Sequence, residues 1–308
     1  MRDFHQQTWD EQIIDDCRRL VHLAVREDLD REHDWTTVSL VPRDAAATAA
    51  VVARQHGVIV GQKAAELVCQ EMNLQAQWQP LARDGDAVTA GQTVATLTGS
   101  ARDLLTAERT FLNFMGRLSG VATLTRQFID AIAGLPARLY DTRKTTPGWR
   151  RLEKYAVRCG GGHNHRSGLY DAFLIKDNHL ALGAGLTAAE RFTPANAVAH
   201  AKVFLQQLQP ERKREDGLLI EIELDRLDDF KAVLAAGPDI ILLDNMPLDV
   251  LREAVARRNA AGSKVELEAS GGVRLETVRA IAETGVDRIS CGALTHSAVN
   301  FDVALDWQ

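Results

Sequence analysis

Residues 218–245, LLIEIELDRLDDFKAVLAAGPDIILLDN, contain the pattern from which the architecture of this 308-residue chain can be inferred. The segment holds two short apolar runs, LLIEIELD and IILLDN, which are separated by a helical stretch and end in polar residues. A strand, a polar end and a helix in this order are typical of the βα units of a parallel sheet. In an α/β barrel the carboxyl ends of the strands build the active site, so the polar ends are the first place to look for chemistry.

The same pattern recurs on both sides of this segment, after about residue 135. The further runs are LYDTRK, AFLIKDNH, VELEASGG and RISCGALTH. Six units in place of eight predict an open, incomplete α/β barrel. A doubly wound sheet is the alternative, but it favours an early GxGxxG turn, and none follows these strands.

The first part of the chain predicts a separate region of helices and strands. Thr8 and Glu11 have the spacing of a capping box, and apolar residues at helical spacing follow them. Between Thr48 and Gly99 we expect strands around a helix at about residues 62–70. Residues 84–99 resemble the hairpin of lipoyl and biotinyl carrier domains, but no lysine stands at the tip. We therefore interpret them as a structural β-hairpin.

A long helix is expected next, capped by Ser100 and ending near Ser119. Its apolar side includes Leu104, Leu105, Phe111, Leu112, Met115 and Leu118. Arg109, Asn113 and Arg117 recur every four residues, so they share one polar face.

The composition indicates an ordinary folded protein. Charged residues make up 25% and hydrophobic residues 45% of the chain. No apolar run approaches the roughly 20 residues that span a bilayer, and the start lacks the order of a signal peptide, so we expect a cytoplasmic protein without a membrane partner. The four cysteines lie far apart, which predicts buried thiols. A net charge of -6 without a basic stripe argues against nucleic-acid binding.

One segment departs from this acidic background. Residues 141–179 carry eight Lys or Arg, four Asp or Glu and three His. Arg143 and Lys144 follow the first barrel strand, and Arg166 and Lys176 flank the second. Because arginine offers a planar fork to carboxylate or phosphate and lysine a compact charge, we expect a pocket for a small, multiply anionic ligand. A solvated basic face is the alternative.

Glycines follow the last two predicted strands, in Ser270-Gly271-Gly272 and in the segment CGALTH, which contains Gly292 and His296. Barrels commonly bind phosphate at their final two βα loops, where glycine lets backbone N–H groups approach the oxygens. A phosphorylated substrate is therefore expected. Glycines that merely end strands are the alternative.

Carboxylates lie along one strand and end the next. Those that share one strand face are Glu221, Glu223 and Asp225. An inward carboxylate is unfavourable unless it meets a metal or hydroxyls, so Glu223 and Asp244 are candidates to hold Mg²⁺ or sugar hydroxyls. Ion pairs with nearby Arg and Lys are the alternative. His163 and His165 are expected to contact anions, since Arg166 beside them would repel a cation.

A series of motifs runs in order from residue 108 to residue 297. They are Glu108-Arg109-Thr110, LSGVAT, DTRKTTPG, EKYAVRCGGGHNHR, LIKDNH, EIELD, ILLDN, EASGG and GALTHS. With them the sequence closely resembles the quinolinate phosphoribosyltransferases, also called nicotinate-nucleotide pyrophosphorylases (carboxylating). GGGHNHR and DTRKTTPG are the most specific motifs. Cys291 stands where a small apolar residue is expected, and a free cysteine packs as one.

The resemblance implies an α/β protein with two domains. An N-terminal α/β sandwich-like domain would span residues 1–118, and an open α/β barrel phosphoribosyltransferase domain would span residues 119–296. The C-terminal tail, residues 297–308, would pack on the first domain. A homodimer is also implied, in which each active site lies between one subunit's barrel and the other subunit's N-terminal domain.

The resemblance also implies a division of the site between the substrates. The quinolinate and pyrophosphate region would be lined by Arg143, Lys144, His165, Arg166 and Lys176, with Arg109 from the partner subunit. Glu223 and Asp244 would hold the ribose hydroxyls of phosphoribosyl pyrophosphate and its Mg²⁺, directly or indirectly. The 5-phosphate would be cradled by Ser270, Gly271, Gly272, Gly292 and His296. The catalytic candidates are Lys144, Lys176, Glu223 and Asp244, and no tightly bound organic cofactor is expected.

The implied pentosyltransferase reaction, a step of de novo NAD biosynthesis, converts quinolinate and phosphoribosyl pyrophosphate to nicotinate mononucleotide, pyrophosphate and carbon dioxide. Loss of pyrophosphate develops positive charge on the ribose and negative charge on the leaving group, which fixed carboxylates and cations can stabilise. No nucleophilic side chain is required. Alternatives are a relative with altered substrate choice, a barrel aldolase with Lys176 as Schiff-base nucleophile, and a non-catalytic binding module.

Overall fold

The computed structural model describes residues 3–183, 192–208 and 217–308 of the chain. These residues form two compact units. The parallel-sheet unit comprises the chain up to Gln6, Phe128–Arg143 and His163–Ala293, and the antiparallel-sheet unit comprises Gln7–Gln127, Lys144–Gly162 and Leu294–Gln308. The sequence predicted a single domain boundary between residues 118 and 119, whereas segments of the two units alternate along the chain.

Helix α4, Ala101–Ala131, is one physical reason for this difference. The sequence predicted that the helix ends near Ser119, but it continues through Gly120. A Cβ on Gly120 would lie 2.1 Å from the carbonyl oxygen of Val299. The glycine therefore allows the segment at Val299 to approach the helix closely, and it does not end the helix. Val121 and Phe128 are buried beyond it, and the apolar spacing therefore carries the helix from one unit into the other.

The parallel-sheet unit is the open α/β barrel that the sequence predicted. Its strands are β6 (Arg138–Tyr140), β7 (Phe173–Ile175), β8 (Ile220–Leu224), β9 (Ile240–Asp244), β10 (Glu266–Ser270) and β11 (Arg288–Ser290). They form one six-stranded sheet in the order β6-β11-β10-β9-β8-β7, and all neighbours are parallel. Among the described residues no ladder joins β6 to β7, so the barrel is open at this seam.

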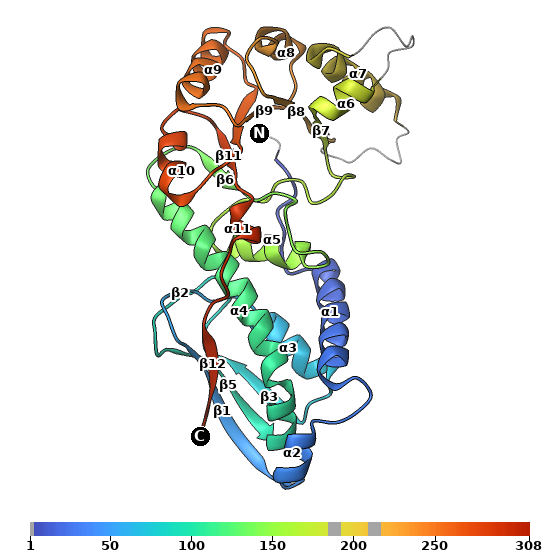
Figure 1. The fold of residues 1–308 in the computed structure, drawn as a ribbon, viewed down its shortest axis with the longest axis vertical. Coiled ribbons are helices and arrows are strands. Elements are labelled where there is room, and N and C mark those ends of the chain that lie inside the picture. Colours follow the sequence, from blue (N-terminus) through green and yellow to red (C-terminus); the bar gives the residue numbers. More distant parts are fainter. Residues whose placement is uncertain (1–2, 184–191, 209–216) are drawn as a thin grey trace. The chain divides into compact units, whose positions relative to one another are not determined.

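Helices connect the strands of this unit. They are α6 (Asp177–Leu182), α7 (Pro194–Gln207), α8 (Phe230–Ala236), α9 (Leu248–Ala260) and α10 (Leu275–Ala282). Helix α7 begins with a Thr193 cap and Pro194 at its first position, a combination that suits a helix start. Figure 1 shows α7, α8 and α9 on the outer side of the strands. The strands are therefore covered, and most of their apolar residues are buried.

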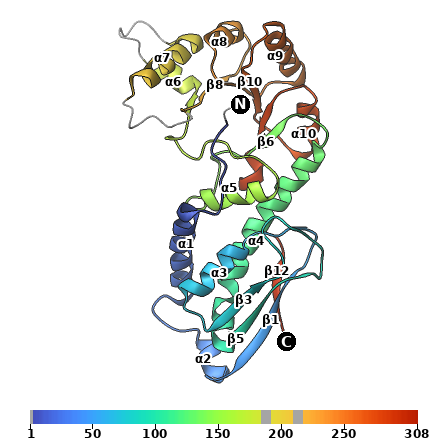
Figure 2. The ribbon, with the colours of Figure 1, turned by 180° about the vertical axis from the view of Figure 1, so that it is seen from behind.

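The antiparallel-sheet unit is built on a four-stranded sheet in the order β12-β1-β5-β3. These strands are β1 (Ala46–Ala53), β3 (Ala76–Pro80), β5 (Thr93–Ser100) and β12 (Val303–Trp307). Helix α4 packs on the sheet (Figure 2), and the ring of Phe111 meets Trp78 edge to face at 5.6 Å. The remaining elements are α1 (Glu11–Leu29), α2 (Trp35–Leu40), β2 (Gly57–Val58), α3 (Gln62–Glu71), β4 (Ala87–Val88), α5 (Arg150–Cys159) and α11 (Ala293–His296).

Two local predictions for this unit are wrong, although the helix expected at residues 62–70 is confirmed as α3. Helix α1 is capped by Asp10 and not by Thr8, because the Asp10 carboxylate accepts hydrogen bonds from two amides of the first turn. The expected hairpin of residues 84–99 is also absent. Strand β4 pairs with β2, whereas β5 pairs with β1 and β3, because Gly91 between them bonds to the carbonyl of Ala53.

No helix in the described part of the chain is long and apolar enough to cross a bilayer.

Candidate active site

The carboxyl ends of strands β7 to β10 bring several predicted residues to one edge of the parallel sheet. Lys176 directly follows β7, Glu223 lies near the end of β8, and Asp244 and Ser270 end β9 and β10. Asp244 and Ser270 are direct partners in the β9–β10 ladder. The ammonium of Lys176 donates a hydrogen bond to the Glu223 carboxylate. Both side chains stay partly exposed, so a ligand can reach this ion pair.

The loops after β9 and β10 touch, and this contact requires a glycine. The amide of Asn245 donates to the carbonyl of Ser270 at 2.8 Å, and the Asn245 side chain donates to Asp244 at 2.8 Å. Gly271 has φ of 92°, and a Cβ there would lie 2.2 Å from the Asn245 side-chain oxygen. Gly272 has φ of 61°, and a Cβ there would meet no atom within 4 Å. The glycines thus place one loop backbone beside Asp244 and leave open space next to it.

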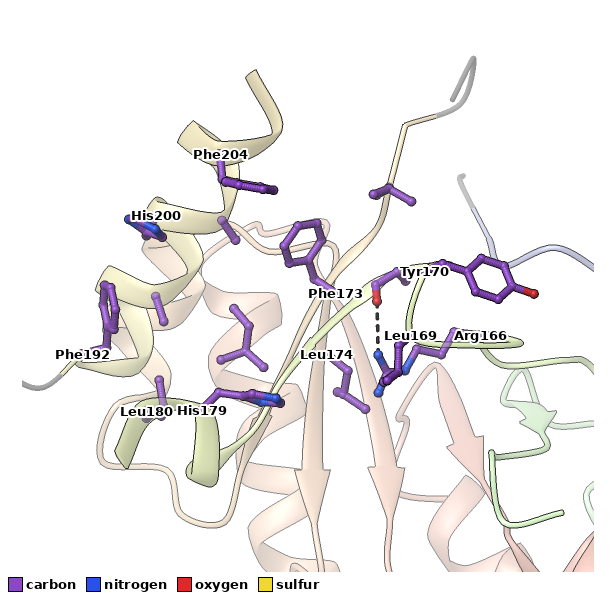
Figure 3. Close-up of a pocket in the computed structure, with 15 residues that line it drawn as sticks. Arg166, Leu169, Tyr170, Phe173, Leu174, His179, Leu180, Phe192, His200 and Phe204 are labelled. Carbon is purple, nitrogen blue, oxygen red and sulfur yellow. Dashed lines mark hydrogen bonds between the residues drawn. The ribbon is translucent and has the colours of Figure 1, made fainter. Parts of the chain in front are cut away.

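Arg166 is a buried cation in the segment between α5 and β7. Its side chain donates to the carbonyl of Ala172 at 3.2 Å, the bond that is dashed in Figure 3. Its Nε is buried and has no hydrogen-bond partner among the described residues. Burial lowers the pKa of Arg166, and the neighbouring positive charge of Arg143 lowers it further. Two adjacent guanidinium groups favour an anion between or beside them.

His165 turns into the interior of the open barrel. Its Nε2 lies 3.0 Å from a Glu221 carboxylate oxygen and 3.4 Å from one of Glu268. The amide nitrogen of Arg166 lies 2.8 Å from Nδ1, and Nε2 donates toward the two carboxylates. Burial would lower the pKa of His165, but Glu221 and Glu268 outweigh burial and raise it to about 9. Both ring nitrogens therefore have protein partners, and substrate contact by His165 stays a prediction.

Sequence reasoning missed two buried residues of the cluster around His165, Glu268 and Arg288. Glu268 is fully buried and pairs with Arg288, whose Nε lies 2.9 Å from the carboxylate. Alternation of Glu266 and Glu268 along VELEASGG is the signal that could have placed them on one strand face. The counter-charge comes from another strand, β11, which a local pattern does not reveal.

His165, Glu221 and Glu268 offer ligand atoms that lie within 4.8 Å of one another, the spacing of a metal site. These ligand atoms already have other partners. Nε2 of His165 faces both carboxylates, and the guanidinium of Arg288 forms an ion pair with Glu268. This donor set fits a shared proton better than a cation, because Arg288 already supplies the positive charge.

Three predicted residues belong to the antiparallel-sheet unit. Arg109 on α4, Lys144 and His296 are exposed in this unit. The imidazole of His296 pairs with the hydroxyl of Ser297 at 2.8 Å. The carbonyl of Lys144 accepts a hydrogen bond from the Thr295 hydroxyl at 2.7 Å. The other predicted residues, including Arg143 and Gly292, belong to the parallel-sheet unit.

A cavity of about 540 Å³ lies beside β7, lined by residues of α6 and α7 and the segment before β7. In Figure 3 the rings of Phe173, Phe204 and His179 border it, and Arg166 lies at one side. Its lining is mainly apolar, which does not suit a multiply charged ligand. The charged strand ends are the better candidate site.

Cys291 is 1% exposed and follows β11, where its amide bonds to the carbonyl of Tyr140. It packs as a small apolar residue, as expected.

Known proteins with similar sequences place this site in one family. Family models described as the N-terminal and C-terminal domains of quinolinate phosphoribosyl transferase match residues 34–119 and 121–306. The nicotinate-nucleotide pyrophosphorylase (carboxylating) of Mycobacterium leprae is 43% identical over 295 residues, which cover 95% of this chain and 98% of that protein. A solved nicotinate-nucleotide pyrophosphorylase from Francisella tularensis is 38% identical, with a TM-score of 0.84 and coverage of 96% of this chain and 97% of that one. The chain therefore belongs to the quinolinate phosphoribosyltransferase family.

Proposed function

We propose that the protein converts quinolinate and phosphoribosyl pyrophosphate to nicotinate mononucleotide, pyrophosphate and carbon dioxide, as a step of NAD biosynthesis. The observation that carries the proposal is the buried Arg166 guanidinium, whose Nε lacks a partner among the described residues and which lies near Arg143. Such a pair favours a planar anion, and quinolinate carries adjacent carboxylates.

The division of the site follows the strand order. Quinolinate and pyrophosphate would meet Arg143, Lys144, His165, Arg166 and Lys176. The ribose hydroxyls would meet Glu223 and Asp244, and the 5-phosphate would meet Ser270, Gly271, Gly272, Gly292 and His296. The contact between Asn245 and Gly271 supports this order, because it sets the Asp244 carboxylate next to the open backbone at Gly272.

The first step breaks the bond between the anomeric carbon and pyrophosphate, and the ring nitrogen of quinolinate forms the new bond. Asp244 and Glu223 would stabilise the positive charge that develops on the ribose. The cations would stabilise the leaving pyrophosphate and hold the ring nitrogen in line. Because this work is positioning and electrostatics, no covalent enzyme intermediate is needed.

The second step removes the carboxylate next to the ring nitrogen as carbon dioxide. The nitrogen is now a pyridinium, which stabilises the electron pair left on the carbon, and this carbon then takes up a proton. Arg166 and Arg143 would hold the retained carboxylate while the other departs.

The Lys176–Glu223 ion pair supports this mechanism over a Schiff-base aldolase. A nucleophilic lysine must present an unprotonated amine, whereas Lys176 donates to a carboxylate. A related phosphoribosyltransferase-fold protein with an altered substrate is the second candidate, and the substrate comparison below separates the two.

Mg²⁺, when bound, would neutralise charge on the pyrophosphate. Glu223 and Asp244 supply the oxygen ligands that this cation prefers. The Lys176 ammonium on Glu223 favours contact through water or ribose hydroxyls over direct coordination of that carboxylate. We further propose a cytoplasmic homodimer with Arg109 supplied in trans, and no organic cofactor, nucleic acid or membrane partner.

A substrate comparison tests the proposal. With phosphoribosyl pyrophosphate and Mg²⁺, quinolinate should yield nicotinate mononucleotide and carbon dioxide. Nicotinate lacks one carboxylate, and each lost charged contact costs roughly 1.5–3 kcal/mol. The kcat/KM for nicotinate should therefore be lower than the kcat/KM for quinolinate by at least about tenfold to a hundredfold. Equal turnover of nicotinate would contradict the assignment.

A further inference from the structure

The first described residues of the chain, Asp3 to Gln6, belong to the parallel-sheet unit although α1 directly behind them belongs to the other unit. They also lie outside the matched family models, which begin at residue 34. Phe4 is 4% exposed and forms a core cluster with Ala172, Leu219 and Ile240, at the starts of β7, β8 and β9, and with Tyr140, which ends β6. The segment thus packs into the interior of the open barrel.

Phe4 contacts the candidate site through His165. Their ring centroids lie 4.3 Å apart at an interplanar angle of 30°. The guanidinium of Arg288 lies 4.9 Å from the Phe4 ring, and the same group pairs with Glu268. The ring of His165 is therefore fixed by an aromatic face on one side and by carboxylates at its Nε2.

Gln6 makes a second contact with the same segment. Its side-chain NH₂ donates to the carbonyl of Asn164 at 3.1 Å, and its side-chain oxygen accepts from the amide of Asn164 at 2.8 Å. This reciprocal pair fixes the backbone directly before His165 and Arg166. Asp3 anchors the start of the segment through Arg288 and the hydroxyl of Tyr140, at 3.0 and 2.8 Å.

We propose that Asp3 to Gln6 are a positioning element of the active site, in which Phe4 and Gln6 hold His165 and Arg166 in the orientation that meets the dicarboxylate substrate. This inference rests on the proposed function. Phe4 and Gln6 touch no substrate themselves; they act through the segment that carries the histidine and the buried arginine. The effect of their loss should therefore fall on one substrate and not on both.

Steady-state kinetics of the full chain test this selectivity. Phe4→Ala should raise the KM for quinolinate about fivefold, the size expected for loss of an aromatic pair, and leave the KM for phosphoribosyl pyrophosphate within about twofold. Phe4→Leu restores most of the buried volume, so it should recover the melting temperature but only part of the quinolinate KM. Gln6→Ala should shift the same KM in the same direction.

Phe230→Ala is the matched control. Phe230 is equally apolar, 0% exposed and in the same unit, but it lies on α8. Its loss should lower the melting temperature as much as Phe4→Ala does and leave both KM values unchanged when assays run well below that temperature. Two results would show that Phe4 is only a core residue. One is an equal change of both KM values in Phe4→Ala, and the other is the same rise of the quinolinate KM in Phe230→Ala.

An NMR measurement on the substrate-free protein separates this inference from the proposed function. The ring nitrogen signals of His165, assigned by their loss in His165→Gln, should shift in Phe4→Ala and stay in place in Phe230→Ala. If wild-type protein fails to use quinolinate, the proposed function falls while these signals still report on positioning. Unchanged His165 signals in Phe4→Ala would overturn the positioning role.

Discussion

The buried carboxylate of Glu153 on α5 accepts hydrogen bonds from the guanidinium of Arg117 on α4. The same carboxylate accepts from the amide and the hydroxyl of Thr146, at 3.1 and 2.8 Å. Arg117 also donates a hydrogen bond to the backbone carbonyl of Thr295. The hydroxyl of Thr295 in turn donates to the backbone carbonyl of Lys144. One ion pair therefore fixes the loop from Lys144 to Thr146 at two points.

Loss of this ion pair should destabilise the antiparallel-sheet unit. Glu153→Ala leaves a largely buried guanidinium without its counter-charge, which should lower the free energy of unfolding by about 3 kcal/mol. Denaturant titration measures the change. Arg54→Ala is the control, since the Arg54–Asp306 pair of the same unit is 39% and 47% exposed. That variant should lose less than about 1 kcal/mol, and similar losses in both would contradict the role of burial.

Asp244→Asn should separate the two substrates. The lost charge matters most as the ribose becomes cationic, so kcat and the kcat/KM for phosphoribosyl pyrophosphate should fall about tenfold to a hundredfold, with little change in quinolinate affinity. Asp249→Asn removes the same charge from an exposed position on α9 and should leave the kinetics unchanged. A selective loss of quinolinate binding in Asp244→Asn would refute the proposed division of the site.

Mixing two inactive variants should restore activity if Arg109 acts across a homodimer. Arg109→Ala and Lys176→Ala lie in different units, so a mixed dimer would carry both lesions in one site and leave the other intact. Random pairing makes about half the dimers mixed, which predicts roughly a quarter of wild-type activity. Mass spectrometry verifies the exchange. Absence of recovered activity in verified mixed dimers would show that Arg109 serves its own subunit.

The pKa of His165 predicts how stability depends on pH. Burial opposes the rise, but Glu221 and Glu268 bring the pKa from 6.5 to about 9. A group with a raised folded pKa stabilises the fold fully below its unfolded pKa and loses that contribution as pH rises through the folded value. Unfolding free energy should therefore fall between about pH 6.5 and 9.

His165→Gln should remove most of this pH dependence in denaturant titrations at several pH values. His200→Gln, an exposed histidine on α7, should retain it. If both variants behave like the wild type, the dependence arises from other groups.

The open barrel could be predicted because its signals are local. Strands such as IILLDN end in polar residues, and the structure confirms six parallel strands with Asp244 and Ser270 at their ends. The Asp10 cap and the path of β4 could not be predicted in the same way, because each depends on which of several adjacent polar or glycine residues the tertiary structure selects. Thr8 and Asp10 are both suitable caps by residue type, and only the helix start distinguishes them.

The interior of the barrel was also beyond local patterns. Glu221 was visible as an inward carboxylate, but its partner His165 comes from the middle of the chain. The ring of Phe4, from the start of the chain, packs on this histidine, and Arg288, near its end, pairs with Glu268. The sequence predicted a metal or hydroxyls for such a carboxylate, and the structure provides an imidazole for Glu221 instead. Roles of the individual site residues therefore stay predictions for the experiments above.

The pairing of β12 with β1 has a consequence for synthesis of the protein. Val51 lies opposite Leu305, so the edge of β1 has no partner on this side until β12, about 250 residues later in the chain, has been translated. Contacts so distant in sequence form slowly, and an unpaired strand edge can associate with other chains in the meantime. Emergence of β12 from the ribosome thus sets the earliest moment at which this sheet can close, and a nascent chain that stalls before β12 would leave one edge of β1 exposed.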